Sequence, residues 1–194
     1  MVYSRTVGNK ELSFGVSGRL YKSNVLLYDH QTESLWSQLM ARAVSGPMAG
    51  DRLTVLSSHR TQWGSWMSRY PETRILSPRT GFDRNYALDP YEGYYRVGAI
   101  WFPVGDVRKD LPPKERVLGI VVGSASRAYP LSRVRPRYGA IDDVVGGVAL
   151  RLLIDADGSI SGVVDDRGEP LPHLFVYWFA WQAFHPDTTV FEFR

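Results

Sequence analysis

The sequence predicts an α+β protein that is mainly β, with two related halves of hairpins, helix and strand in one globular unit. Short runs of β-branched and aromatic residues, separated by turns rich in Gly, Asn and Asp, dominate the chain. Only two segments have clear helical periodicity, and each carries a Trp-x-x-Trp pair followed by a proline. Because these segments match at a constant spacing, we expect the fold to contain an internal repeat.

The first half is predicted to consist of hairpins followed by one helix. Turns at Ser17-Gly18 and Ser23-Asn24 separate β-rich runs. Aromatic and apolar side chains at helical spacing predict a helix over residues 58–70, which Pro71 ends. The strands of this half are expected at residues 12–16, 19–21, 25–28, 32–38 and 73–77, and a long ordered loop is expected at 78–95.

The second half is predicted to contain the same kinds of element. Asp157-Gly158 is a hairpin turn between two apolar runs. Pro172 opens a predicted helix that runs to residue 184 and stops at His185-Pro186, since proline is tolerated at the first helical position. Strands are expected at residues 100–102, 117–122, 149–154, 160–164 and 188–193.

The two helical segments share the pattern W-x-x-W-x4-P-[ED]-T-x-[IV]-[LF]. The first copy spans residues 63–76 and the second spans 178–191. We interpret the match as a duplication, with the first repeat at 1–97 and the second at 98–194. Residues 117–147 of the second repeat have no counterpart in the first. The first repeat is therefore expected to be truncated at its N-terminus.

Composition and charge exclude several classes of site and partner. The chain has no cysteine, which excludes disulfides, iron–sulfur clusters and thiolate zinc sites. The formal net charge is only +3, and the one basic cluster, at residues 133–137, lacks the broad basic face of a nucleic-acid site. The longest apolar run has 11 residues, whereas a helix that crosses a bilayer needs about 20. We predict neither a nucleic-acid partner nor a transmembrane segment.

Several motifs together resemble a known family. They are Phe14-Gly15-Val16-Ser17-Gly18, Tyr28-Asp29-x-x-Thr32-Glu33-Ser34-Leu35-Trp36-Ser37-Gln38, Arg127-Ala128-Tyr129-Pro130-Leu131, Asp143-x-x-Gly146-Gly147 and Trp178-Phe179-Ala180-Trp181. With them the chain resembles the uncharacterised prokaryotic family called domain of unknown function 3179, although Asp142 stands where the family tends to have Asn. The resemblance implies a further Tyr-Pro-Leu unit upstream of Val2, which this chain lacks, and it favours an extracytoplasmic location. It implies no activity.

Few residues are arranged for chemistry. The four histidines are not spaced as a metal-binding pair, and His185 is interpreted as a protonated cap at the end of the second predicted helix. Asp155-Ala156-Asp157-Gly158 has its glycine too early for a calcium loop. No glycine-rich segment follows the spacing of a phosphate-binding loop. The sequence predicts no metal and no cofactor, and it leaves the catalytic residues open.

Aromatic residues are the most unusual feature of the composition. The chain has six Trp, 11 Tyr and eight Phe, and most of the tryptophans lie inside the motifs. One interpretation is a core packed around a pseudo-twofold axis, because buried rings stabilise a fold strongly. The other is an aromatic groove for a sugar, a peptide or a flat cofactor.

These observations leave two hypotheses for function. The first is a non-catalytic binding or scaffold module, which could be a subunit of a larger assembly with a protein partner or a homo-oligomer. The second is an enzyme or redox accessory with its site between the two halves. Convergence of His59, Asp29 and Asp142-Asp143 in one cleft would favour the enzyme. The candidate ligand or partner residues are His59, Trp63, Trp66, Asp29, Trp36, Asp143, Trp178, Trp181 and His185.

Overall fold

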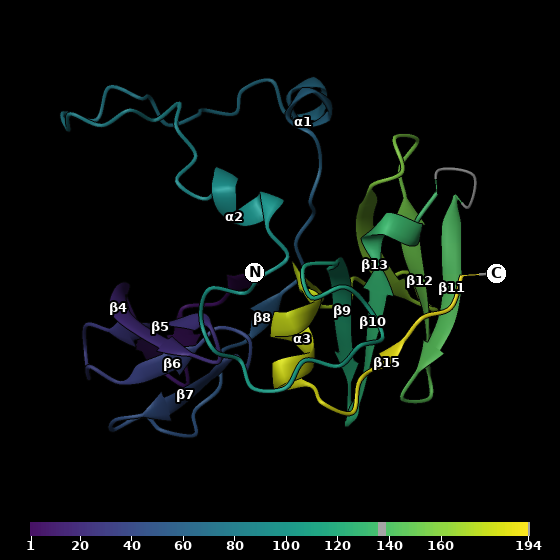
Figure 1. Cartoon of the computed structure of the whole chain (residues 1–194), viewed down its shortest axis with the longest axis horizontal. Coiled ribbons are helices and arrows are strands. Elements are labelled where there is room, and N and C mark those ends of the chain that lie inside the picture. Colours follow the sequence, from purple (N-terminus) through teal and green to yellow (C-terminus); the bar gives the residue numbers. More distant parts are fainter. Residues whose placement is uncertain (136–138, 194) are drawn as a thin grey trace.

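Strands make up most of the regular structure in the computed structural model, which describes residues 1–135 and 139–193 (Figure 1). Pro136 and Arg137 of the predicted basic cluster lie outside these residues. The α+β, mainly β class is confirmed. We divide the chain into an N-terminal part (residues 1–56), an arm (57–106) and a C-terminal part (107–193).

The N-terminal part is an antiparallel meander with two small ladders beside it. The main sheet has the order β4-β5-β6-β7, while β1 pairs with β8 and β2 pairs with β3. The strands are β1 (Val2–Tyr3), β2 (Thr6–Val7), β3 (Lys10–Glu11), β4 (Phe14–Tyr21), β5 (Asn24–Asp29), β6 (Leu35–Ser37), β7 (Arg42–Ser45) and β8 (Val55–Leu56).

The two predicted turns of this part have different outcomes. The register of β4 against β5 shifts between Val16 and Leu20, and Gly18 has a φ of +73°. The turn predicted at Ser17-Gly18 is therefore wrong, because the chain continues there as a bulge inside one strand. The turn predicted at Ser23-Asn24 exists but lies one residue earlier, since Lys22 and Ser23 both adopt the positive φ of a tight hairpin loop and Asn24 begins β5.

Trp36 is the centre of the N-terminal core. It is fully buried against Leu12, Ala43, Met48 and Leu53. Its strand is shorter than the predicted range 32–38, because the residues before Leu35 form the turn that follows Asp29.

The C-terminal part consists of two sheets that enclose a second core. One sheet has the order β14-β9-β10-β15, in which β10 and β15 are parallel, and the other has the order β11-β12-β13. The apolar faces of the two sheets pack together, with Leu118, Tyr129 and Leu152 among the buried residues. The elements are β9 (Arg116–Val122), β10 (Ala125–Pro130), a 3-10 helix (Leu131–Arg133), β11 (Ala140–Val145), β12 (Val148–Ile154), β13 (Ile160–Asp165), β14 (Leu174–Tyr177), α3 (Trp178–Phe184) and β15 (Thr189–Val190).

The predicted helix at 172–184 is a strand followed by a shorter helix. Residues 174–177 form β14, which pairs antiparallel with the first half of β9, and α3 begins only at Trp178. A short apolar run is compatible with either state, and the free edge of β9 decides for the strand. The closing strand, predicted at 188–193, is limited to Thr189–Val190 because only these residues pair with β10.

The arm holds the first Trp-x-x-Trp segment, and this segment lies apart from the sheets (Figure 1). Its helices are α1 (Trp63–Arg69) and α2 (Glu92–Arg96), and neither contains a buried residue. Helix α1 is shorter than the predicted 58–70, with Gln62 at its N-cap. The strands predicted at 73–77 and 100–102 are wrong, because neither segment pairs with another strand.

Helix α3 lies between the two sheet systems (Figure 1). Lys22 Nζ donates a hydrogen bond to the carbonyl of Ala183, and the ring of Tyr21 contacts that of Phe184 with centroids 5.5 Å apart. These contacts join the tip of the N-terminal meander to the end of α3. In the part of the chain that the structure describes, no helix has the length and apolarity needed to cross a membrane.

Candidate functional site

Asp29 lies at the end of β5 and is the most enclosed acid of the predicted set, with 0% of its surface exposed. Its carboxylate accepts hydrogen bonds from the indole of Trp36 at 2.8 Å, the hydroxyl of Thr32 at 2.9 Å and the Thr32 backbone N–H. Burial alone raises the pKa of Asp29, but these hydrogen bonds outweigh it, so its pKa lies below the usual value. The carboxylate is thus a charged structural anchor for the turn.

Asp143 joins two of the sequence motifs. Its carboxylate accepts hydrogen bonds from Arg127 at 2.6 and 2.7 Å and from the phenol of Tyr129 at 2.6 Å. Burial, together with this carboxylate, raises the pKa of Tyr129. Asp142, which precedes Asp143 in β11, pairs with Arg151 on the other face of the strand, because successive side chains of a strand point to opposite faces.

The two Trp-x-x-Trp segments have the same local geometry. The indole N–H of Trp66 donates to the hydroxyl of Thr73 at 2.9 Å, and that of Trp181 donates to Thr188 at 2.8 Å. Each helix ends on a residue with nearly the same backbone angles, −133° and 70° at Tyr70 and −130° and 68° at the C-cap of α3. The aromatic ring at each C-cap also packs on the second tryptophan of its own helix.

The surroundings of the two helices differ. Trp178 and Trp181 are fully buried, and the ring of Trp181 lies so close to Gly119 of β9 that a Cβ there would be 2.4 Å from it. In α1, by contrast, Trp63 is 50% exposed. The chain that follows α1 carries Leu76, which is 98% exposed.

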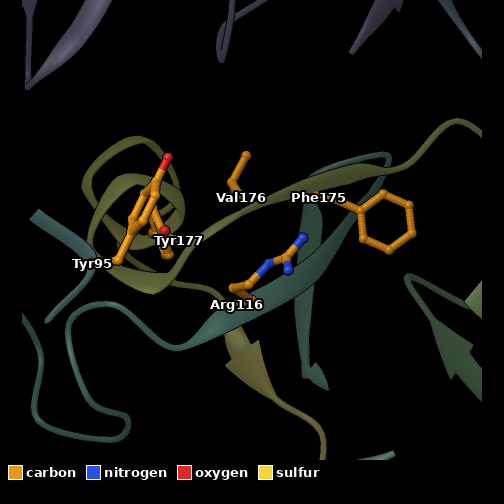
Figure 2. Close-up of a pocket in the computed structure, with 5 residues that line it drawn as sticks. All are labelled: Tyr95, Arg116, Phe175, Val176 and Tyr177. Atoms are coloured by element: carbon orange, nitrogen blue, oxygen red, sulfur yellow. The ribbon is translucent and has the colours of Figure 1, made fainter. Parts of the chain in front are cut away.

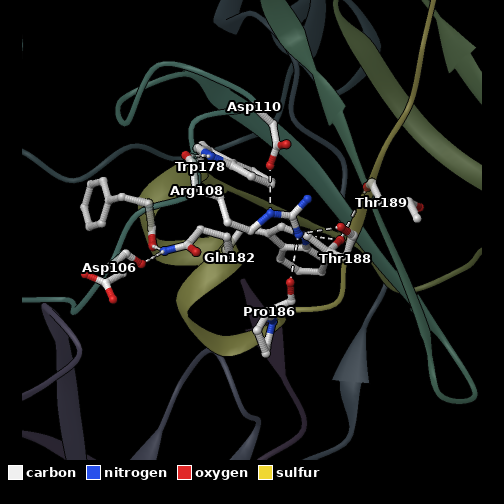
Figure 3. Close-up of polar contacts among 10 residues, drawn as sticks. Asp106, Arg108, Asp110, Trp178, Gln182, Pro186, Thr188 and Thr189 are labelled. Carbon is white, nitrogen blue, oxygen red and sulfur yellow. Dashed lines mark hydrogen bonds and ion pairs between the residues drawn. The ribbon is translucent and has the colours of Figure 1, made fainter.

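A polar network fixes the C-terminal end of α3 (Figure 3). Arg108 donates hydrogen bonds to the carbonyl oxygens of Pro186 at 2.8 Å and Thr188 at 2.7 Å, and it pairs with Asp110. Its guanidinium also lies over the ring of Trp178, 5.3 Å from the centroid. The loop before β9 thereby holds the second Trp-x-x-Trp segment in place.

The histidines have separate environments. His59 donates a hydrogen bond from Nδ1 to the carbonyl of Ser161 in β13, so it contacts the C-terminal part. Burial lowers the pKa of His185 to about 4, which keeps its imidazole neutral at pH 7. The prediction of a protonated helix cap at His185 is therefore wrong, because desolvation opposes the charge that the helix end would favour.

The predicted site residues do not converge. Strands β5 and β11, which carry Asp29 and Asp143, lie on opposite sides of the molecule (Figure 1), and each carboxylate is held by its own neighbours. A cavity of about 310 Å³ does lie between the N-terminal and C-terminal parts. Of the predicted residues, Trp181 and His185 line it, and it is also lined by His173, which sequence reasoning did not select.

A second, more open pocket lies between α2 and β14 (Figure 2). It has a volume of about 490 Å³ and is lined by Tyr95, Arg116, Phe175, Val176 and Tyr177. In the close-up, Arg116 has Tyr177 on one side and Phe175 on the other. This arrangement fits the aromatic groove that the composition suggests, since a guanidinium among rings can stack on a planar group.

A family model matches most of the chain. The family model described as Protein of unknown function (DUF3179) matches residues 1–162 of the 194 in the chain. The chain belongs to the DUF3179 family. Neither curated proteins nor solved structures give a match.

The DUF3179 match includes some of the candidate residues and leaves others out. Asp29, Trp36 and Asp143, with their hydrogen-bond partners, fall within residues 1–162, as does the arm with α1. Helix α3 and His173 lie beyond it. The two carboxylate anchors and α1 thus lie within the part of the chain that matches the family model, whereas the cavity is lined both by matched residues of the N-terminal part and β9 and by unmatched residues of β14 and α3.

Proposed function

We propose that the protein is a non-catalytic binding module that takes up a partner protein through its arm. The observation that carries this proposal is that α1 has the local geometry of α3 but not its packing. The shared geometry supports a duplication with halves at 1–97 and 98–194. Two copies of one motif are expected to need the same kind of support.

The strands packed against α3 show which kind of support α1 does not have. Trp181 packs on Gly119 at the centre of the β9–β10 hairpin, and β15, which follows α3, runs parallel to β10. Among the described residues, no hairpin is placed in this way against α1, and residues 73–77 pair with no strand. We infer that the partner presents a β-hairpin with a small residue facing Trp66.

The exposed side chains of the arm support the same proposal. A soluble protein rarely leaves many large apolar side chains together in solvent unless they meet a partner. Besides α1 itself, the arm exposes Tyr70, Ile75, Leu76, Phe82, Tyr86, Leu88, Tyr91, Tyr95, Val97, Trp101 and Phe102.

The test uses the whole chain and a probe taken from its own sequence. A backbone-cyclised peptide of residues 116–130, which carries the β9–β10 hairpin, is labelled and titrated with the protein while fluorescence anisotropy is recorded. We expect saturable binding that Trp66→Leu weakens by at least about tenfold, because the anchor ring is lost. Val16→Leu, a change at an exposed position of β4 outside the arm, is the control and should leave the affinity unchanged.

A second peptide tests the required geometry. Gly119→Val in the peptide places a branched side chain where Trp66 must pack, so binding should be lost. Equal binding of both peptides, or equal affinity of the parent protein and Trp66→Leu, would refute the proposed docking. Native purification gives an independent check, since a monomer recovered without any partner counts against an assembly.

The cavity between the two parts favours a second candidate function. Residues from both parts line it, and two of them, His173 and His185, are histidines whose pKa is lowered by burial. An enzyme or redox accessory with its site between the halves would use this cavity. Chemical modification of His185 that abolishes an activity found in the purified protein would favour this alternative over the binding module.

A further inference from the structure

The pocket between α2 and β14 contains an arginine that no described part of the chain neutralises. Arg116 is the charged residue of its lining, and it is exposed to solvent at the start of β9. Within residues 1–135 and 139–193, its guanidinium takes part in no ion pair and no hydrogen bond. A guanidinium is a planar fork of N–H donors that can hold a carboxylate through two parallel hydrogen bonds. The side chain is therefore available to an anion from outside the chain.

Two acidic residues close to this lining have other partners. Glu115 precedes Arg116 in the chain, and its Oε1 accepts a hydrogen bond from the backbone N–H of Ser132 at 3.0 Å. The carboxylate of Asp89 accepts one from the hydroxyl of Tyr95. No acidic residue that the structure describes lines the pocket itself. A ligand carboxylate would thus face Arg116 without a competing or repelling carboxylate in the lining.

A second guanidinium adds positive charge beside the pocket. Arg60 lies over the ring of Phe175, with its guanidinium carbon 5.7 Å from the ring centroid, and it has no ion-pair partner in the described ranges. Phe175 lines both this pocket and the smaller one that contains Arg60. The two unpaired charges together raise the local electrostatic potential, which favours a negatively charged ligand.

Aromatic rings flank Arg116 on the strands. Tyr177 stands directly opposite Arg116 in the antiparallel pairing of β14 with β9, so the two side chains share one face of the sheet. Phe175, two residues earlier in β14, points to the same face. Figure 2 shows the guanidinium with Tyr177 on one side and Phe175 on the other. The cation thus lies among ring surfaces on which a flat group can stack.

Helix α2 supplies a third ring, that of Tyr95, which is 54% exposed. Lys114 fixes this helix to the chain just before β9, because its Nζ donates hydrogen bonds to the carbonyl oxygens of Tyr94 at 2.5 Å and Val97 at 2.6 Å. The ammonium also lies over the ring of Tyr94, 3.4 Å from the centroid. These contacts keep Tyr95 beside the strands that carry the rest of the lining.

We propose that this pocket binds a small aromatic carboxylate, which takes two hydrogen bonds from Arg116 and packs its ring on the aromatic lining. The volume of about 490 Å³ is within the range of small-molecule sites. The groups that the ligand contacts are accessible, since Arg116 and Tyr95 are exposed and Phe175 and Tyr177 are partly exposed. The inference goes beyond the docking of a partner on the arm and does not rest on it, because α1 contributes no residue to the pocket.

Three ligands of nearly the same outline separate charge from shape. Naphthoate is flat and anionic, naphthamide is flat and neutral, and decahydronaphthoate is anionic but puckered. In isothermal titration of the full chain, naphthoate should bind at least about tenfold more tightly than naphthamide, because only the carboxylate forms two charge-assisted hydrogen bonds. It should bind at least about threefold more tightly than decahydronaphthoate, whose saturated rings cannot stack on the lining.

Variants at exposed positions locate the site. Arg116→Gln removes the unpaired guanidinium, so naphthoate and naphthamide should bind equally weakly. Arg116→Lys keeps the charge without the planar fork and should retain only part of the preference. Arg19→Gln, at an exposed arginine of β4, removes the same charge outside the pocket and should bind all three ligands as the parent protein does. Tyr95→Leu should reduce the preference for naphthoate over decahydronaphthoate.

The guanidinium itself gives a direct readout. The Nε–H resonance of Arg116, assigned in a ¹⁵N NMR spectrum by its absence from Arg116→Gln, should shift as naphthoate is added. Equal affinities for naphthoate and naphthamide, undetectable binding of naphthoate, an unchanged Arg116 resonance at saturation, or equal weakening by Arg116→Gln and Arg19→Gln would overturn the proposal. Unfolding midpoints of these two variants should match that of the parent protein, since neither arginine side chain has a described polar partner to lose.

Discussion

The buried carboxylate of Asp29 accepts a 2.8 Å hydrogen bond from the indole N–H of Trp36. This contact ties the end of β5 to the residue at the centre of the N-terminal core. It also explains why acid and tryptophan occur together in the motif, since each satisfies a polar group that the other's burial would leave unpaired.

Asp29→Asn should destabilise the N-terminal part. The amide keeps one acceptor oxygen but presents N–H groups to the donors of Trp36 and Thr32, so we expect a loss of about 2–3 kcal/mol in the free energy of unfolding. Urea unfolding at pH 7, followed by tryptophan fluorescence, measures this. Because the folded pKa of Asp29 lies below its unfolded value, its stabilisation is present above the unfolded pKa and is lost as the pH falls through the folded pKa. A variant as stable as the parent protein at pH 7 would contradict the anchor.

The two tryptophan–threonine hydrogen bonds should differ in their contribution to stability. Thr188→Val leaves the buried indole N–H of Trp181 without an acceptor, at a cost of about 1–3 kcal/mol. Thr73→Val breaks the same bond at the partly exposed Trp66, where water can replace the hydroxyl, so the free chain should lose much less. Thermal unfolding of both variants gives the comparison, and equal losses would show that α1 is as well packed as α3.

Gly119 should tolerate no side chain. Gly119→Ala places a Cβ 2.4 Å from the ring of Trp181, which must move out of its position between β9 and α3. We expect destabilisation of at least about 1–3 kcal/mol, as for other overpacked cores. The control is Gly64→Ala in α1, where nothing lies within 4 Å, and this change should be neutral or slightly stabilising because alanine favours a helix. Near-equal unfolding midpoints for the two variants would disprove the close approach.

Stability should decline in mild acid because of the buried histidines. Unfolded His185 takes up a proton below about pH 6.5, whereas the folded residue stays neutral until about pH 4. The unfolded state therefore binds more protons in this window, and the free energy of unfolding falls there by at most about 1.4 kcal/mol per pH unit. Burial acts on His173 in the same direction.

His185→Gln should flatten this decline. The comparison is a set of urea unfolding curves at pH 7, 6, 5 and 4.5 for the parent protein and the variant. His30→Gln, outside the cavity, is the control and should follow the parent. Parallel curves for His185→Gln and the parent protein would show that this imidazole does not account for the acid sensitivity.

Much of the local structure could be predicted from the sequence. The Asp157-Gly158 turn lies in the loop between β12 and β13 as expected, because Asp and Gly favour tight turns through their own backbone and nearest neighbours. The strand predicted at 117–122 is also confirmed, because its run of β-branched residues favours a strand over a helix. The Asp29 motif and the Asp143 motif were both selected as sites, but their roles as anchors required their partners to be known.

The cavity between the N-terminal and C-terminal parts could not be predicted from the sequence. His185 is a candidate from the sequence because it lies at the end of a predicted helix. The sequence predicts a protonated imidazole there, whereas burial in the folded protein keeps it neutral at pH 7. His173 gave a weaker signal, a lone histidine next to Pro172 without metal-ligand spacing. The cavity forms only because a loop of the N-terminal part approaches β14 and α3 across more than 100 residues of sequence, and no local pattern encodes such a contact.

The sequence by itself determined the class of the fold, the family and the two Trp-x-x-Trp segments with their local geometry, because periodicity, turn residues and prolines act within a few residues of chain. Only the tertiary structure decided which segment is buried. Helix α3 has the β9–β10 hairpin beneath it and becomes core, whereas α1 has the same pattern without such a hairpin and stays exposed. Burial depends on what the rest of the chain places against a helix face, and that is a property of the assembled fold.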